Sequence, residues 1–236
     1  FSFARSKWLE VKSQEDFTDP DQQRLFELDG TLVNRFVGYR SDGIFMSQSD
    51  IDAYEVVQDG NANMTIRPGD IRYRDLDGDG EITFRDQEEI AYAPGLPELV
   101  GGLNLGIEYK NFRLSGLLQG ASKFSINISG NARNPFSNGS IPLTYQFDHR
   151  WQPDPDNPGV NINPNASLPG ITQAPGVNNN RTSDFWVRDV TYLRLKNINL
   201  SYSLPATVLS KIGFSSLQVY VAGENVISTN NLGIYR

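Results

Sequence analysis

The sequence predicts an all-β protein, more specifically a segment of an antiparallel transmembrane β-barrel with long extracellular loops. Long stretches alternate between apolar and polar residues, and short and long connections between these stretches also alternate. The composition agrees, because the 236 residues include 21 Gly and 13 Pro, and the mean hydropathy is −0.43. This profile suits a β-rich chain with polar loops better than a compact helical enzyme.

Several function classes are excluded by composition. The absence of cysteine rules out disulfides, thiolate metal sites and cysteine nucleophiles. A single histidine, His149, argues against a Ser-His-Asp triad and against a histidine-rich zinc site. A net charge of −7 without any basic run argues against nucleic-acid binding. No acid–base pair or nucleophile constellation stands out, so the protein is not expected to be an enzyme.

The membrane question is decided by strands rather than helices. No run of about 18 apolar residues predicts a transmembrane helix, but transmembrane β-strands need only about 10 residues of alternating character. The first residues, "FSFARSKWLEV", read like the middle of a strand and not like a signal peptide. We therefore expect an internal piece of a longer protein.

A β-hairpin is predicted from "GLNLGIEYKNFRLSGLLQG". Two alternating runs meet at the two-residue polar turn Lys110-Asn111, and the second run can continue through residue 129. One face of the pair carries Leu103, Leu105, Ile107, Tyr109, Phe112, Leu114 and Leu118. An ordinary soluble sheet would show the same alternation.

A second long strand is predicted in "FWVRDVTYLRLKNINLSYSLP". Apolar residues occupy odd positions at Leu193 and Leu195, then even positions from Ile198 onward. This phase change near Lys196-Asn197 predicts a β-bulge or kink. A short link at about residues 205–215 leads to another strand, where Leu217 begins a new alternation, and the tail from about residue 227 reads as irregular.

The connections differ in length in a regular order. The turn at Lys110-Asn111 and the link at 205–215 are short, whereas residues 130–185 form one long stretch rich in Asn, Pro and Gly. Loops this long are usually functional or disordered. Short turns on the periplasmic side and long loops outside are typical of outer-membrane barrels, so this order favours a barrel over a soluble sandwich.

The stretch "DLDGDGEITFRD" at residues 75–86 resembles a calcium loop. Oxygen ligands at positions 1, 3, 5, 7 and 12 of such a loop fall here on Asp75, Asp77, Asp79, the backbone carbonyl of Glu81, and Asp86. We expect a structural Ca²⁺ here, with Mg²⁺ less suitable, and a solvated acidic turn without metal is the alternative. The preceding "GDIRYR" reads as extended and only "RDQEEIAY" could form a helical turn, which argues against a paired EF-hand sensor.

Five segments in fixed order resemble a known family: "GYRSDGIFMSQSDIDAY", "PGDIRYRDLDGDGEITFRDQ", "GGLNLGIEYKNFRLSGLLQG", "SDFWVRDVTYLRLKNINLSYSLP" and "LQVYVAGENVIS". From about residue 36 onward, the chain resembles the C-terminal barrel region of SusC/RagA-type TonB-dependent outer-membrane transporters of Bacteroidota. The resemblance implies that residues 1–236 are a portion of the C-terminal domain of a 22-stranded barrel. It further implies about six to eight barrel strands, with the N-terminal plug outside this chain.

The function implied by the resemblance is import of oligosaccharides or oligopeptides across the cell outer membrane. The implied partners are a SusD-like surface lipoprotein that acts as a lid, TonB acting through the plug, the substrate and outer-membrane lipid; a glycan is slightly favoured because most of the family imports glycans. A soluble calcium-dependent glycan-binding β module is the alternative. A dockerin-like scaffold module is disfavoured, because dockerins carry two such loops.

Aromatic side chains in or beside the long loop are candidates for contact. Phe136, Tyr145 and Trp151 are the candidates for substrate or lid contact, although loop packing explains Trp151 at least as well. Phe185 and Trp186 directly precede a strand and fit an aromatic girdle at the membrane interface.

Overall fold

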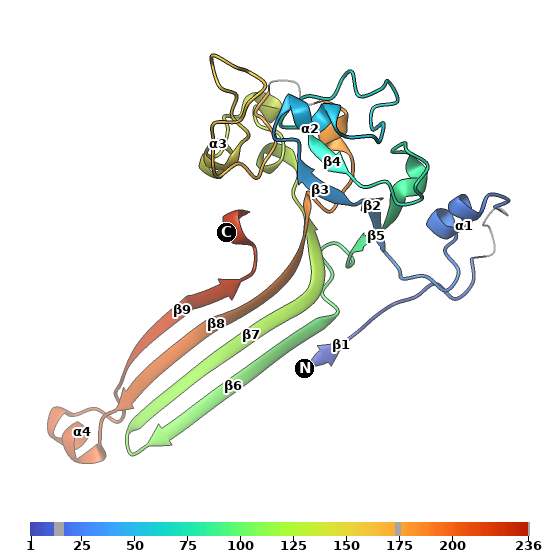
Figure 1. The fold of residues 1–236 in the computed structure, drawn as a ribbon. Helices are drawn as coiled ribbons and strands as arrows, with labels where there is room; N and C mark the ends of the chain where they lie inside the picture. The colour runs from blue at the N-terminus through green and yellow to red at the C-terminus, as the bar shows by residue number, and fades with distance from the viewer. Residues whose placement is uncertain (12–16, 173–175, 236) are drawn as a thin grey trace.

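The computed structural model describes residues 1–11, 17–172 and 176–235. The chain forms a long, tilted antiparallel sheet with an irregular lobe at one end (Figure 1). The sheet has the order β1-β6-β7-β8-β9. Its strands are β1 Ser2–Phe3, β6 Leu99–Tyr109, β7 Phe112–Asn127, β8 Val187–Ser203 and β9 Gln218–Asn230.

The predicted hairpin is confirmed, because β6 and β7 pair antiparallel with Tyr109 opposite Phe112. Lys110 adopts a left-handed conformation with φ 53°, as a tight two-residue turn requires. β9 continues to Asn230, beyond the point where the sequence reads as irregular. Within the described residues the main sheet has five strands, fewer than the six to eight expected, because much of the chain before β6 folds into the lobe instead.

The predicted bulge is also confirmed. Leu118 pairs with Leu195 and Leu117 with Asn197, so Lys196 is skipped in the β7–β8 ladder. The register of β8 with β9 shifts at the same place. The extra residue keeps the apolar side chains before and after it on one face of the sheet, since a one-residue slip would otherwise reverse them.

That face of the sheet is apolar and open to its surroundings. Registered neighbours place the side chains of β6 to β9 on it, and many are half to three-quarters exposed, such as Ile107 at 67% and Val221 at 73%. Its exposed members include Leu103, Leu105, Ile107, Tyr109, Phe112, Leu114, Leu193, Leu200, Val219, Val221 and Ile227. The opposite face carries mostly polar residues, among them Asn104, Arg113, Ser115, Gln119, Asn199, Ser201 and Gln218.

The first part of the lobe contains two small antiparallel sheets. β2 Phe36–Tyr39 pairs with β5 Gln87–Ala91, and β3 Ser41–Ile44 pairs with β4 Ile71–Tyr73. Two short helices accompany them, α1 Pro20–Phe26 and α2 Gln48–Asp52, the latter capped by Ser47. The segment before the acidic loop is extended, as expected, since it contains β4. After the loop, only the 3₁₀ turn η1 Phe84–Asp86 forms, and the rest of "RDQEEIAY" belongs mainly to β5.

The second part of the lobe is the connection between β7 and β8. Its described residues contain short helical turns and isolated bridges but no strand: η2 Gly130–Ala132, η3 Ser137–Gly139, α3 Thr144–His149 and η4 Asn178–Asn180. At the other end of the sheet the connections are compact, namely the turn after β6 and α4 Ala206–Ile212 after β8 (Figure 1). A last turn, η5 Gly233–Tyr235, follows β9.

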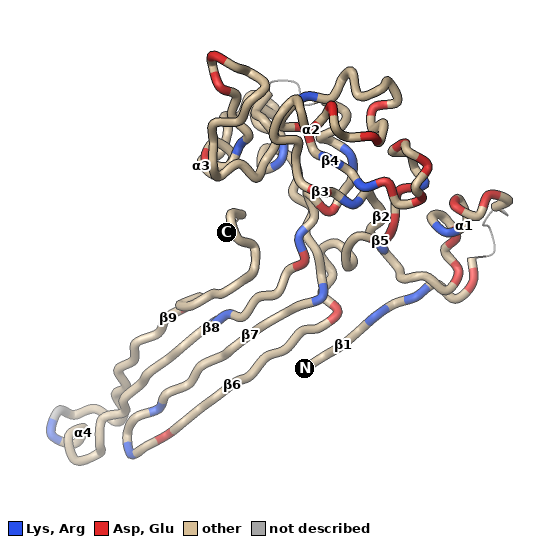
Figure 2. Tube along the Cα trace, viewed as in Figure 1, with Lys and Arg blue, Asp and Glu red and all other residues tan. Residues whose placement is uncertain are grey.

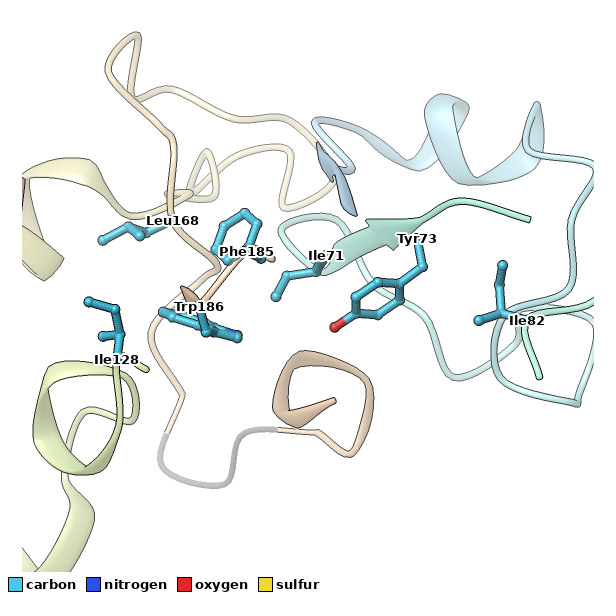
Figure 3. Packing of buried hydrophobic residues seen from close by; sticks show 7 residues of the cluster. All are labelled: Ile71, Tyr73, Ile82, Ile128, Leu168, Phe185 and Trp186. Carbon is cyan, nitrogen blue, oxygen red and sulfur yellow. The ribbon is translucent and has the colours of Figure 1, made fainter. Parts of the chain in front are cut away.

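Both parts of the lobe share one hydrophobic core. Ile71 and Tyr73 of β4 are fully buried against Phe185, Trp186 and residues from the long connection (Figure 3). The expectation that Phe185 and Trp186 form a membrane girdle is therefore wrong. Both are at least nine-tenths buried, because they enter the lobe core just before β8 starts.

Charge separates the sheet from the lobe. Charged residues are sparse along β6 to β9 and dense in the lobe (Figure 2). None of the helices in the described ranges is both long and apolar enough to cross a bilayer.

Candidate functional site

Three carboxylates of the acidic loop converge. One oxygen each from Asp75, Asp77 and Asp86 lies within 4.8 Å of the others. Oxygens bound to one Ca²⁺ at about 2.3–2.6 Å lie no more than about 5 Å apart, so this spacing fits a single calcium ion. The hard oxygen donors also fit the chemistry of that ion.

The loop folds this way because its own backbone binds the carboxylates. The N–H groups of Gly78 and Gly80 donate to the two oxygens of Asp75 at 2.6 and 2.8 Å. Both glycines have positive φ, 77° and 86°, a backbone conformation in which a residue with an L side chain would be strained. Asp86 closes the loop, since it is fully buried and accepts the N–H groups of Leu76 and Thr83 at 2.8 and 2.7 Å.

The electrostatics of the group favour a cation. Burial raises the pKa of Asp86 above its ordinary value, and the negative charges of Asp77 and Asp75 add to that effect against the backbone hydrogen bonds from Thr83 and Leu76. For Asp75, burial opposes ionisation, but hydrogen bonds from the N–H groups of Gly80 and Gly78 hold its pKa below the ordinary value. A bound divalent ion would offset the repulsion among the three groups.

One predicted carboxylate ligand lies outside this group. Asp79 is not among the three converging carboxylates, and its Oδ1 accepts the N–H of Glu81 at 2.8 Å. The side chain of Glu81 is exposed, while its backbone forms a bridge with Val57. The adjoining Ile82 is buried in the lobe core, so the loop is anchored to the lobe.

Trp151 lies inside the lobe. It is only 6% exposed, and its indole Nε1 donates to the carbonyl oxygen of Met46 at 3.0 Å. Gly69, with φ 92°, lies against the ring so closely that a Cβ there would approach ring atoms to 3.0 Å. This environment agrees with the loop-packing interpretation of Trp151 and leaves little of the ring for a ligand.

The other two aromatic candidates differ from each other. The hydroxyl of Tyr145 donates to the carbonyl of Ala132, its ring packs edge-on against Tyr235 at 5.2 Å, and burial raises its pKa to about 12. Phe136 is 39% exposed in a left-handed conformation with φ 65°. Of the three candidates, Phe136 offers the most accessible ring.

A buried amide network joins the long connection to β4, and no periodicity in the sequence indicates it. Gln58, which is fully buried, donates to the carbonyl of Ile71 at 2.7 Å and accepts the N–H of Tyr73 at 3.0 Å. Asn179 accepts the N–H of Ile71 at 2.9 Å, and Asn178 donates to the carbonyl of the same residue at 2.8 Å. The run of asparagines at 178–180 was the only visible hint.

Known proteins with similar sequences are TonB-dependent receptors. The chain is 26% identical over 243 residues to TonB-dependent receptor P3 of Formosa agariphila, which covers 97% of this chain and 22% of that protein. It is 27% identical over 198 residues to TonB-dependent receptor P26 of the same organism, covering 84% and 18%. No family model matches the chain.

Solved structures with a similar fold come from the RagAB peptide importer. In its "open-open" state one chain matches with a TM-score of 0.54 and 16% identity, covering 93% of this chain and 21% of that one. Another RagAB peptide transporter structure matches with a TM-score of 0.54 and 18% identity, covering 87% and 20%. The chain spans about a fifth of the length of these proteins.

The resemblance seen in the sequence is thereby confirmed. The chain is similar over most of its length to TonB-dependent receptors, as the resemblance to SusC/RagA-type transporters implies. Its antiparallel sheet has the fold of the matching part of the RagAB importer.

Proposed function

We propose that this chain forms part of the wall and outer mouth of a TonB-dependent outer-membrane transporter that imports oligosaccharides or oligopeptides. The observation that carries the proposal is the exposed apolar face of β6 to β9, found in a chain related to TonB-dependent receptors. An apolar face this large needs a partner, since soluble monomers rarely expose apolar patches beyond a few hundred Å². Lipid is the partner that a barrel wall requires.

The dimensions of the sheet support a membrane location. β6 has 11 residues, and at about 3.3 Å per residue it spans roughly 33 Å. A tilt of about 40° reduces that length to a height of about 25 Å, the height of the apolar band of outer-membrane barrels. Tyr109, Phe112 and Tyr202 are aligned across three strands at the short-turn end, where an aromatic girdle is expected. The soluble glycan-binding alternative gives no reason for this pattern.

The proposed orientation follows from the connections. Short turns belong to the periplasmic side of such barrels, so Lys110-Asn111 and α4 would lie in the periplasm and the lobe would face the outside. There the lobe would form part of the docking surface for a SusD-like lid. Contact surfaces combine a polar rim with aromatic anchors, and Phe136 supplies an accessible ring in a polar, asparagine-rich connection. The energy for uptake would reach the barrel through TonB and the plug.

The same proposal includes a structural cation in the lobe. Asp75, Asp77 and Asp86 would hold Ca²⁺, which would neutralise their charges and stiffen the loop. Mg²⁺ suits the loop less well, because it demands near-ideal octahedral geometry and retains several waters. Extracellular calcium modules can bind with dissociation constants as weak as about 10⁻⁴ to 10⁻³ M, so partial occupancy of the site is expected.

The test uses point variants of the complete transporter in its own cells, because deleting part of the lobe would disrupt its fold. Leu168 and Asn179 of the long connection are buried in the lobe, so deleting residues 131–180 would expose its core. The better variant is Phe136→Asp, since Asp tolerates a left-handed backbone better than Phe does. The matched control is Met64→Asp, which changes a 73% exposed residue elsewhere in the lobe.

Uptake of labelled oligosaccharides and oligopeptides, and co-purification of the lid lipoprotein, are the measurements. We expect TonB-dependent uptake of one of the two classes, with Phe136→Asp reducing both uptake and lid association while Met64→Asp does not. Uptake of neither class, or uptake that persists without TonB, contradicts the transport proposal. Equal behaviour of the two variants contradicts only the role of Phe136.

A further inference from the structure

A hollow lies on the apolar face of the sheet, near the lobe end of the strands. The hollow has a volume of about 360 Å³, within the range of about 300–1,000 Å³ typical of small-molecule sites. Its lining is almost entirely apolar and includes Phe1, Gly101, Leu103, Leu118, Gly120 and Leu193.

Two glycines that face each other line this hollow. Gly101 of β6 is directly opposite Gly120 of β7, so neither residue contributes a side chain there. The ring of Phe1 lies over Gly101, and a Cβ there would approach Phe1 Cδ1 to 2.4 Å. Leucine side chains border the hollow on the neighbouring positions of the same face, so its shape suits a flexible hydrocarbon chain.

Cationic groups lie immediately beyond the hollow toward the lobe. Phe3 pairs with Leu99, and its ring is contacted by Lys123 Nζ at 5.4 Å and by the Arg5 guanidinium at 5.8 Å from the centroid. Arg5 is paired with Glu98 through a 2.6 Å ion pair. Within the described part of the chain, no carboxylate forms an ion pair with Lys123, whose side chain is exposed.

Toward the lobe, this face therefore presents first the hollow, then the ring of Phe3, and then the cations of Lys123 and Arg5 with the single carboxylate of Glu98. Lipids with phosphate on the headgroup have the matching order of acyl chain and anion. On the proposed orientation, the lobe end of the strands lies in the outer leaflet. We propose that the hollow binds an acyl chain of lipid A, the phosphorylated glycolipid of that leaflet, with a phosphate held by Lys123 and flanked by Arg5. This inference rests on the proposed membrane function.

The complete transporter, extracted in detergent and studied by native mass spectrometry, tests this site. The probes are bisphosphorylated lipid A, the same lipid after enzymatic dephosphorylation, and phosphatidylglycerol. Lys123→Gln removes the cation, and Leu193→Trp fills the hollow from a half-exposed position that needs no repacking of a core. Lys110→Gln is the matched control, because it removes an exposed lysine at the opposite end of the sheet.

We expect lipid A to bind wild type more tightly than the dephosphorylated lipid or phosphatidylglycerol. Lys123→Gln should weaken lipid A binding about fivefold, the effect of one basic side chain near an anionic lipid surface, and Lys110→Gln should not. Leu193→Trp should weaken the phosphorylated and dephosphorylated lipids alike, because it blocks the acyl chain.

Three outcomes overturn the inference: equal binding of lipid A with and without phosphate, equal loss in Lys123→Gln and Lys110→Gln, or tightest binding of phosphatidylglycerol. A variant that lost the heat-resistant folded form in gels would be replaced by Leu103→Trp on the same border. The proposed function has a separate readout. A transporter that fractionates with the outer membrane but shows no such binding fails this inference alone, whereas one found outside the membrane fails the proposed function itself.

Discussion

The side-chain amide of Gln58 forms a hydrogen bond with the backbone of Tyr73, as a neighbouring strand would. Its Oε1 accepts the N–H of Tyr73 at 3.0 Å while its Nε2 donates to the carbonyl of Ile71 at 2.7 Å, so one amide satisfies two backbone groups of β4. β3 pairs with the other edge of β4. The same Nε2 lies 2.9 Å from Asn178 Oδ1, which connects β4 to the segment that leads into β8. The lobe is thus fastened to the sheet by side-chain amides as well as by its apolar core.

Gln58→Ala should therefore loosen the lobe without unfolding the sheet. The substitution leaves the buried N–H of Tyr73 without a partner, whereas the carbonyl of Ile71 keeps its hydrogen bond from Asn178, so the free energy of local opening around β4 should fall by about 1–3 kcal/mol. Hydrogen exchange of the Ile71 and Tyr73 amides measures the change. Gln48→Ala is the control, because the side-chain amide of Gln48 donates to the exposed carboxylate of Asp52 and not to a buried group. Unchanged exchange in Gln58→Ala would show that water replaces the amide at no penalty.

The contact between Gly69 and Trp151 should be intolerant of a methyl group. Gly69→Ala places a Cβ at 3.0 Å from the indole in a backbone with φ 92°, so both crowding and strain disfavour it. Gly170→Ala places a Cβ at an ordinary 3.7 Å from the same ring and should be tolerated. We expect about 1–3 kcal/mol of local destabilisation in the first variant only, seen as faster thermolysin cleavage in the lobe. Equal cleavage of both variants would contradict the packing described for Trp151.

Deleting Lys196 should be far more damaging than replacing it. The bulge at Lys196 keeps Ile198, Leu200 and Tyr202 on the apolar face, and removing one residue would turn them to the polar face. We expect the deletion variant to lose the heat-modifiable folded form on gels, while Lys196→Ala retains it. A deletion variant that still assembles would mean that the bulge can move along β8 and that its position is not essential.

Calcium affinity should depend on Asp77 more than on Asp79. The carboxylate of Asp77 belongs to the converging group, whereas that of Asp79 does not. Asp77→Asn should reduce calcium affinity about tenfold, and Asp79→Asn should reduce it less, as measured by calorimetry on the calcium-free transporter. Removing calcium from wild type should raise hydrogen exchange in residues 75–86 only. Equal affinities of the two variants, or equal losses, would contradict the assignment of the three ligands.

The turn after Gln58 should depend on pH through Asp59. Burial opposes ionisation of Asp59, but hydrogen bonds from the Thr65 hydroxyl and from the N–H groups of Thr65, Asn61 and Asn63 lower its pKa to about 2. Because the folded pKa lies below the unfolded value of about 4, the stabilisation is present above pH 4 and is lost as the pH falls through about 2.

Hydrogen exchange of those three amides, corrected for intrinsic rates, measures this effect. Protection should fall between pH 4 and pH 2 in wild type. In Asp59→Asn, protection should be lower throughout and should not change over that interval. A pH-dependent loss of the same size in the variant would assign it to another group.

Much of the sheet was predictable from the sequence for a physical reason. Side chains of a strand alternate with a period of two, so the order of apolar residues directly predicts the hairpin at Lys110-Asn111 and the phase change at Lys196. The acidic spacing of residues 75–86 predicted four carboxylates that could meet, because the ligands of such a loop are neighbours in sequence, and three of them converge while Asp79 does not. Family resemblance could add the type of protein, since ordered motifs survive where overall identity is low.

The tertiary structure decided what lies far apart in the chain. Aromatic residues look alike in a sequence whether they face lipid, ligand or core, and only packing shows that Phe185, Trp186 and Trp151 are buried while Phe136 remains accessible. The same holds for Gln58 with Asn178, and for Phe1 with Gly101, because their contacts join segments without any shared periodicity. Local alternation determines which face of a strand is apolar, but long-range packing determines what covers it.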